Sequence, residues 1–190
     1  MNYQKKVIIK IKKYLELEII VDDYNQKKLV LNYLQKARHN FLVSQFIEKG
    51  TSNQKVLEEL GFSTELRAFD WVINTAYYAM YMAAQAVLAA IGIKCENHTA
   101  TPYALEYYFV FQDTLEQQYV DLLRESQTME PVEVERLRRG KELRLEAQYD
   151  VSKSMIQERA LSLLSDAGRF IERMELLIAA ISKQDDVISK

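Results

Sequence analysis

Two side chains in the last third of the chain, Arg144 and Tyr149, are of types that could act together on a phosphate. A guanidinium grips a phosphate or a carboxylate with two parallel hydrogen bonds. A phenol, with a pKa of about 10, transfers protons poorly near neutral pH. Tyr149 follows Arg144 by five residues, and on a continuous helix this separation places the two side chains about 140° apart around the helix axis. They would reach one small target only if the helix breaks or two subunits contribute.

The helical neighbours of Arg144 offer it no salt bridge. The positions three and four residues away on either side are Gly140, Lys141, Ala147 and Gln148, and none of them is acidic. We therefore expect the guanidinium to face water, another part of the fold, a second subunit or a ligand. A basic cluster around it is interleaved with glutamates, which fits either a phosphate or RNA contact or a mixed solvated face. The cluster comprises Arg136, Arg138, Arg139, Lys141 and Arg144.

A polar and aromatic stripe repeats at helical spacing in the segment before Gly92. Its members are Asp70, Asn74, Tyr78, Tyr81 and Gln85. Such a face is either a solvated surface, on which tyrosines keep their hydroxyls hydrated, or a partly wet interface or cleft. We favour the second interpretation and expect Arg144 to face this stripe. The predicted ligand or dimer cleft consists of Asn74, Tyr78, Tyr81, Gln85, Lys141, Arg144 and Gln148.

The chain has two histidines, and neither belongs to a known catalytic or metal-binding motif. His39 lies in a charged part of an amphipathic helix, where a surface role is expected. His98 lies in a loop just before a helix N-terminus, where it could bind an anion or make a structural hydrogen bond. The sequence has no Cys/His cluster for zinc, no Glu-x-x-His pair and no glycine-rich phosphate loop. We therefore expect no metal and no cofactor.

The elements that must position these residues are predicted to be helices. Only five glycines and two prolines occur in 190 residues, while 48% of the residues are hydrophobic, which favours an all-α fold. An apolar stripe at helical spacing predicts the core: Ile73, Tyr77, Met80, Ala84, Val87 and Ile91. We expect an antiparallel, up-down bundle of five to six helices. Four long helices are predicted at 26–49, 64–91, 102–125 and 154–183, with 131–150 packed on or within the bundle.

The predicted boundaries divide the chain into an N-terminal appendage, 1–24, and the bundle, 25–185. The appendage shows a helical stripe but also the strand-like alternation "YLELEIIV". A helix is favoured because nothing else in the chain offers a strand partner. The last helix is expected to follow a break near Val151–Ser152, with Ser154 and Gln157 as its capping box.

Charge and cysteine content predict a cytoplasmic protein without a membrane segment. The formal net charge is −2, and the single Cys95 fits a reducing compartment. No signal peptide is expected, because charged residues interrupt the apolar ones near the N-terminus. The run Trp71–Ile93 is long enough to raise the question of a membrane span. Its tyrosines, alanines and Asn74 make it weakly hydrophobic, so we interpret it as a buried core helix.

Four pieces of the sequence, in their order and spacing, resemble the HEPN domain. They are "NTAYYAMYMAAQAVLAAIG" (Asn74–Gly92), His98, "ELRLEAQYD" (Glu142–Asp150) and "ERALSLLSDAGRFIERM" (Glu158–Met174). The resemblance spans about residues 28–180. It implies an antiparallel helical bundle that forms a homodimer and can contact nucleotides or RNA. Members are often partners of a minimal nucleotidyltransferase, as toxin–antitoxin pairs.

The resemblance also implies where RNA cleavage would reside. The nuclease members use an arginine followed, four to six residues on, by a histidine, duplicated across the dimer. Arg144 matches the arginine, but Tyr149 stands where the histidine is needed, and no histidine follows Arg144. We therefore expect a binding or interaction module without RNase activity. The alternative is a divergent metal-independent RNase that uses Arg144 with Tyr149 or His98 across the dimer.

Overall fold

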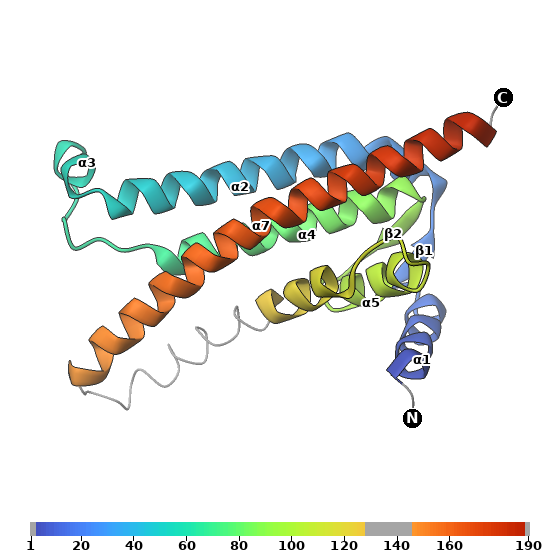
Figure 1. Ribbon diagram of the computed structural model, residues 1–190, viewed down its shortest axis with the longest axis horizontal. Coiled ribbons are helices and arrows are strands. Elements are labelled where there is room, and N and C mark those ends of the chain that lie inside the picture. The colour runs from blue at the N-terminus through green and yellow to red at the C-terminus, as the bar shows by residue number, and fades with distance from the viewer. Residues whose placement is uncertain (1–2, 128–145, 189–190) are drawn as a thin grey trace.

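The computed structural model describes the backbone of residues 3–127 and 146–188, and the side chains of 3–127 and 156–184. Three long helices lie side by side and form the body of the molecule (Figure 1). They are α2 (Val30–Ser52), α4 (Phe69–Ala90) and α7 (Glu146–Ile188). A further helix at 117–127 runs along them, and successive long helices alternate in direction. This confirms the predicted mainly helical, up-down architecture.

Shorter elements gather at the two ends of the long helices (Figure 1). Of the short elements in the described residues, one end carries α3 (Gln54–Glu59) alone. The other end carries the remaining short elements of the described chain. They are α1 (Tyr3–Glu16), β1 (Ile20–Asp22), η1 (Tyr24–Leu29), β2 (Ile93–Cys95), α5 (Ala100–Leu105) and the π-helical turn η2 (Glu106–Val110).

Helix α4 is the centre of the core, because it packs against both α2 and α7. Four members of the predicted apolar stripe are buried and belong to the main core cluster: Tyr77, Met80, Ala84 and Val87. Ile73 and Ile91 are half-buried and pack against it. Alanines fill much of the rest of the helix, and their small side chains let the neighbouring helices approach closely. The predicted core is therefore confirmed. No helix in the described part of the chain is long and apolar enough to span a membrane.

The N-terminal segment combines the two structures that its sequence suggested. Residues 3–16 form the expected helix, with Val7 and Ile11 buried. Residues 20–22 then form a strand that pairs with residues 93–95 in an antiparallel two-stranded sheet. The expectation that no strand partner exists was wrong. The partner follows directly after α4, because Gly92 takes a left-handed backbone conformation, with φ of 77°, and reverses the chain.

The predicted helix at 102–125 is interrupted. Helix α5 passes into the π-helical turn, the chain then breaks at 111–116, and a second helix follows at 117–127. Asp113 adopts a positive φ of 54° without a glycine to signal it, which aspartate tolerates better than most residues. The amide and hydroxyl of Thr114 both donate to the carbonyl oxygen of Phe109, at 3.0 and 2.9 Å, and close the turn.

Other predicted helix ends also moved. Helix α2 continues through Gly50 to Ser52, and Asn53 caps α3 instead. Helix α4 begins at Phe69 rather than at 64. Helix α7 starts at Glu146 and runs through the predicted break at Val151–Ser152, so Ser154 lies inside a helix and is not its cap. Of the helix predicted at 131–150, residues 131–145 lie outside the described chain.

Candidate functional site around His98

His98 lies in the short connection between β2 and α5, where side-chain hydrogen bonds hold the turn. The Oδ1 atom of Asn97 accepts a hydrogen bond from the Ala100 amide at 2.8 Å. The hydroxyl of Thr101 donates to the carbonyl oxygen of Asn97 at 3.0 Å. Gln85 on α4 reaches the same hydroxyl, donating from Nε2 at 3.0 Å. The buried hydrogen bond between Gln85 and Thr101 therefore anchors the His98 turn to α4.

Three tyrosines of α4 surround the imidazole of His98. The hydroxyl of Tyr77 lies 2.5 Å from Nδ1. The Tyr81 ring stacks on the imidazole, with centroids 3.9 Å apart and planes inclined by 12°. The Tyr78 ring meets it edge-on at 5.7 Å and 89°. Helical spacing explains this arrangement, because residues four apart lie on one face and their next neighbour flanks it.

This enclosure fixes the orientation of His98. Tyr77 is fully buried, Tyr81 is buried, and Tyr78 is 37% exposed and marks the surface side of the cluster. The half-buried imidazole has its Nδ1 engaged by Tyr77. Nε2 makes no hydrogen bond to the described residues and is therefore the ring nitrogen available to a ligand. Burial raises the pKa of the Tyr81 hydroxyl, so Tyr81 remains a neutral stacking partner at neutral pH.

The helix at 117–127 supplies a further contact to this turn. Gln127 donates from Nε2 to the backbone carbonyl oxygen of His98. The buried thiol of Cys95, close by on β2, is not a candidate nucleophile. Burial raises the pKa of this thiol, whereas a reactive cysteine needs its thiolate form. The chemistry that these side chains can offer is therefore aromatic stacking and hydrogen bonding.

The structure brings together part of the cleft predicted from sequence. Tyr78 and Tyr81 contact His98, and the buried Gln85 supports the same turn through Thr101. Asn74 lies one turn before Tyr78 on α4 and is half-buried. The remaining members are not placed: Lys141 and Arg144 lie outside the described residues, and so does the side chain of Gln148 in α7. The side chain of Tyr149, a candidate catalytic residue, lies outside them as well. The expectation that Arg144 faces the tyrosine stripe therefore stays a prediction, and its use with Tyr149 stays part of the alternative RNase hypothesis.

Two contributors to the cluster were missed by sequence reasoning. Tyr77 was assigned to the apolar stripe, although its spacing of four residues from Tyr81 places both on one side of α4. Its hydroxyl needs a partner once the ring is buried, and that requirement was the available signal. Gln127 carried no signal, because its target is a backbone carbonyl of a distant turn.

A second polar cluster lies at the same end of the molecule and was also missed. Glu106, in the π-helical turn, is fully buried, and its Oε2 accepts a hydrogen bond from Nη2 of Arg124. The hydroxyl of Tyr3 donates to the same oxygen at 3.2 Å and accepts from Nη1 of Arg124 at 2.7 Å. The guanidinium also lies over the Tyr103 ring, 5.0 Å from its centroid. Oε1 of Glu106 is buried without a hydrogen-bond partner among the described residues.

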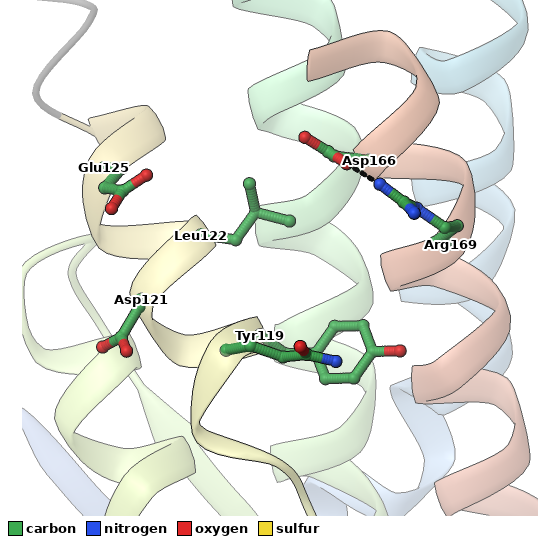
Figure 2. A pocket seen from close by; sticks show the side chains of 7 residues that line it. Tyr119, Asp121, Leu122, Glu125, Asp166 and Arg169 are labelled. Carbon is green, nitrogen blue, oxygen red and sulfur yellow. Dashed lines mark hydrogen bonds and ion pairs between the residues drawn. The ribbon is translucent and has the colours of Figure 1, made fainter. Parts of the chain in front are cut away.

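A surface pocket of about 420 Å³ lies between the helix at 117–127 and α7 (Figure 2). Asp166 pairs with Arg169 across one turn of α7, while Tyr119 and Leu122 come from the facing helix. The other charged residues that line it, Asp121 and Glu125, are acidic. Three carboxylates against one guanidinium make this pocket unfavourable for a phosphate. The pocket is therefore mainly acidic, whereas the predicted cleft contains basic residues and no acidic ones.

Comparison with known proteins agrees with this architecture of an up-down helical bundle. The model of the HEPN domain family matches residues 53–177. Because the match covers most of the chain, this protein belongs to the HEPN domain family. A UPF0332 protein of Archaeoglobus fulgidus is 25% identical over 120 residues, which cover 63% of this chain and 84% of the relative. No solved structure matches the chain. The family match includes α4, His98 and the Glu106–Arg124 pair, while α1, β1 and α2 precede it.

Proposed function

We propose that this HEPN protein is a binding or interaction module that works as a homodimer, as the partner of a minimal nucleotidyltransferase in a toxin–antitoxin pair, and does not cleave RNA. The observation that carries the proposal is the state of its histidines. His39 is exposed on α2, and His98 is held between Tyr77 and Tyr81. Tyr149 stands where the nuclease motif has its histidine. The sequence position at which the motif requires a proton-transfer group suited to neutral pH is therefore occupied by a phenol.

The His98 cluster supports the recognition role of such a module. The half-buried imidazole of His98, stacked on Tyr81 and flanked edge-on by the partly exposed Tyr78, gives a rigid aromatic surface with little conformational entropy to lose on binding. Planar groups such as nucleobases stack on surfaces of this kind. A cationic Arg144 at the same cleft would add a phosphate contact. Nucleotide or RNA binding without cleavage follows from this combination.

One observation favours the alternative, a divergent metal-independent RNase. The hydrogen bond between the Tyr77 hydroxyl and Nδ1 fixes the ring of His98 in the way that an orienting group fixes a general base. In the tautomer in which Nδ1–H donates to the hydroxyl oxygen of Tyr77, Nε2 carries no proton and can accept one. Nε2 of His98 would then take the proton from an RNA 2′-hydroxyl, with Arg144 of the same or the second subunit against the phosphate. This alternative requires Arg144 to come within reach of His98.

The two functions are separated by one set of assays. Purified full-length protein is incubated with structured and unstructured RNA, beside the variants Arg144→Ala, His98→Gln and Tyr149→Phe. His39→Gln is the matched control, because this histidine is exposed on α2. We expect no cleavage by any of these proteins and weaker binding of nucleotide or of the nucleotidyltransferase by Arg144→Ala. Cleavage by the parent that is lost in both Arg144→Ala and His98→Gln, but kept in His39→Gln, would establish the RNase instead.

A further inference from the structure

The N-terminal segment that precedes the family match is attached to the core at two separate places, and both lead to the His98 turn. The first attachment is the two-stranded sheet, in which Ile20 pairs with Cys95 and Asp22 pairs with Ile93. Backbone hydrogen bonds extend the ladder at both ends. The amide of Glu96 donates to the carbonyl oxygen of Ile19 at 2.9 Å, and the amide of Asp23 donates to that of Gly92 at 2.7 Å. The ladder thus ends two residues before His98.

The second attachment is Tyr3, at the opposite end of α1. Its hydroxyl joins the buried carboxylate of Glu106 and the guanidinium of Arg124. Burial and then the neighbouring Glu106 raise the pKa of Tyr3, so the hydroxyl keeps the proton that it donates. Between the two attachments, the buried side chains of Val7 and Ile11 pack α1 against the core. The rings of Tyr14 and Tyr103 lie side by side, with their centroids 6.0 Å apart.

The Tyr3 attachment reaches His98 through the helix at 117–127. Arg124 donates a hydrogen bond to the Tyr3 hydroxyl, and Gln127, one turn further along the same helix, donates to the carbonyl oxygen of His98. On the other side of the turn, α5 leads from His98 directly to Glu106 in the π-helical turn. Three contacts therefore hold the His98 turn. Strand β1 pairs with β2, which precedes the turn, and Glu106 fixes the end of α5, which follows it. Gln127 binds the backbone of the turn itself.

We infer that residues 3–22 form a clamp that sets the position of His98, with Tyr3 as a positioning residue at one end and the β1–β2 pair at the other. The clamp acts on the site but goes beyond the proposed function, because it requires neither nucleotide binding nor RNA cleavage. Its physical basis is the buried carboxylate of Glu106. One oxygen of this group already lacks a partner among the described residues, so loss of the Tyr3 hydroxyl leaves Arg124 as its remaining contact. Removal of that bond loosens the end of α1 and, with it, the helix that holds the His98 carbonyl.

The test uses the full-length protein and two local readouts measured by NMR without denaturant. The first is hydrogen exchange of the Glu96 amide, which is bonded to Ile19. The second is the imidazole signal of His98. His39, exposed on α2, gives the second histidine signal and serves as an internal reference. The variant is Tyr3→Phe, which removes only the hydroxyl. The matched control is Tyr24→Phe, just after the clamp at the start of η1, where the tyrosine is 76% exposed.

We expect Tyr3→Phe to speed exchange of the Glu96 amide about tenfold, as for loss of one hydrogen bond to a charged group, and to shift the His98 signal but not that of His39. Tyr24→Phe should change neither readout. Gln127→Met, which removes the donor to the His98 carbonyl, should shift the His98 signal while the Glu96 amide stays protected. Two results would overturn the clamp. One is an unchanged Glu96 amide and His98 signal in Tyr3→Phe; the other is a uniform acceleration across all amides, which would make Tyr3 a contributor to global stability only. Both readouts are measured without RNA, so a negative result would refute the clamp without testing the proposed function.

Discussion

Replacing Arg124 with methionine should destabilise the protein by about 3–5 kcal/mol, the range measured when one partner of a buried ion pair is removed. Glu106 is fully buried, and Arg124 is one of two groups that donate to its Oε2, while Oε1 has no partner among the described residues. The remaining donor, Tyr3, is neutral and lies at 3.2 Å. Methionine keeps most of the packing volume over the Tyr103 ring, so the loss reports on the charge rather than on a cavity.

The assay is urea unfolding followed by circular dichroism at neutral pH, with the free energy of unfolding extrapolated to water. The matched control is Asp121→Asn, because Asp121 is a half-exposed partner of Arg124 at 3.5 Å and should contribute little. The double variant Glu106→Leu with Arg124→Met should recover most of the lost stability, because no charge then remains buried. A loss below about 1 kcal/mol in Arg124→Met, or a double variant less stable than the single one, would show that Glu106 is hydrated in solution and would refute this reasoning.

Three other outcomes are expected. Met80→Asp should unfold the protein, because Met80 is fully buried in the core and a carboxylate there would be unpaired. Thermal unfolding is measured for this variant and for the control Leu161→Asp, whose side chain is exposed on α7. Equal stability of the two variants would contradict the prediction. Sedimentation velocity at tens of micromolar should show a homodimer, and the variant Tyr78→Asp should dissociate more readily than the unsubstituted protein. An unsubstituted protein that stays monomeric would exclude the homodimer. The hydrogen bond from Arg173 is the main cause that holds the pKa of Glu116 below its ordinary value, and a backbone hydrogen bond and then the charge of Arg173 add to it. The stability that this pair contributes is thus present above the unfolded pKa and is lost as pH falls through the folded one, so Glu116→Gln should lower the urea midpoint at neutral pH but not in strong acid.

Helical class and the position of the core followed from the sequence alone, for a local reason. The hydrogen bonds of a helix join residues four apart, so an apolar stripe at that spacing identifies both the helix and its buried face. Tyr77, Met80, Ala84 and Val87 are buried as this spacing predicted. The family was recognisable for the same reason, because its pieces lie in fixed order along α4, the His98 turn and α7.

Helix ends were decided by contacts that the local sequence does not announce. Asp113 leaves the helical conformation without a glycine or proline beside it. Ser154, a plausible cap by its type, lies inside α7. Helix propensities differ by less than about 1 kcal/mol for most residues, so packing against neighbouring helices outweighs them and moves the ends.

The site was determined partly by sequence and partly by tertiary structure. The spacing of Tyr78 and Tyr81 placed them on one face, but only the fold brings His98 between them, because its turn is set by the pairing of β1 with β2. That pairing joins Ile20 to Cys95, and the register of such distant segments depends on the rest of the chain folding first. Glu106 is the clearest case. Among the tyrosines that follow it, it has the appearance of an ordinary surface glutamate, and it is buried only because Arg124 and Tyr3 meet it there with the hydrogen bonds that a buried carboxylate requires.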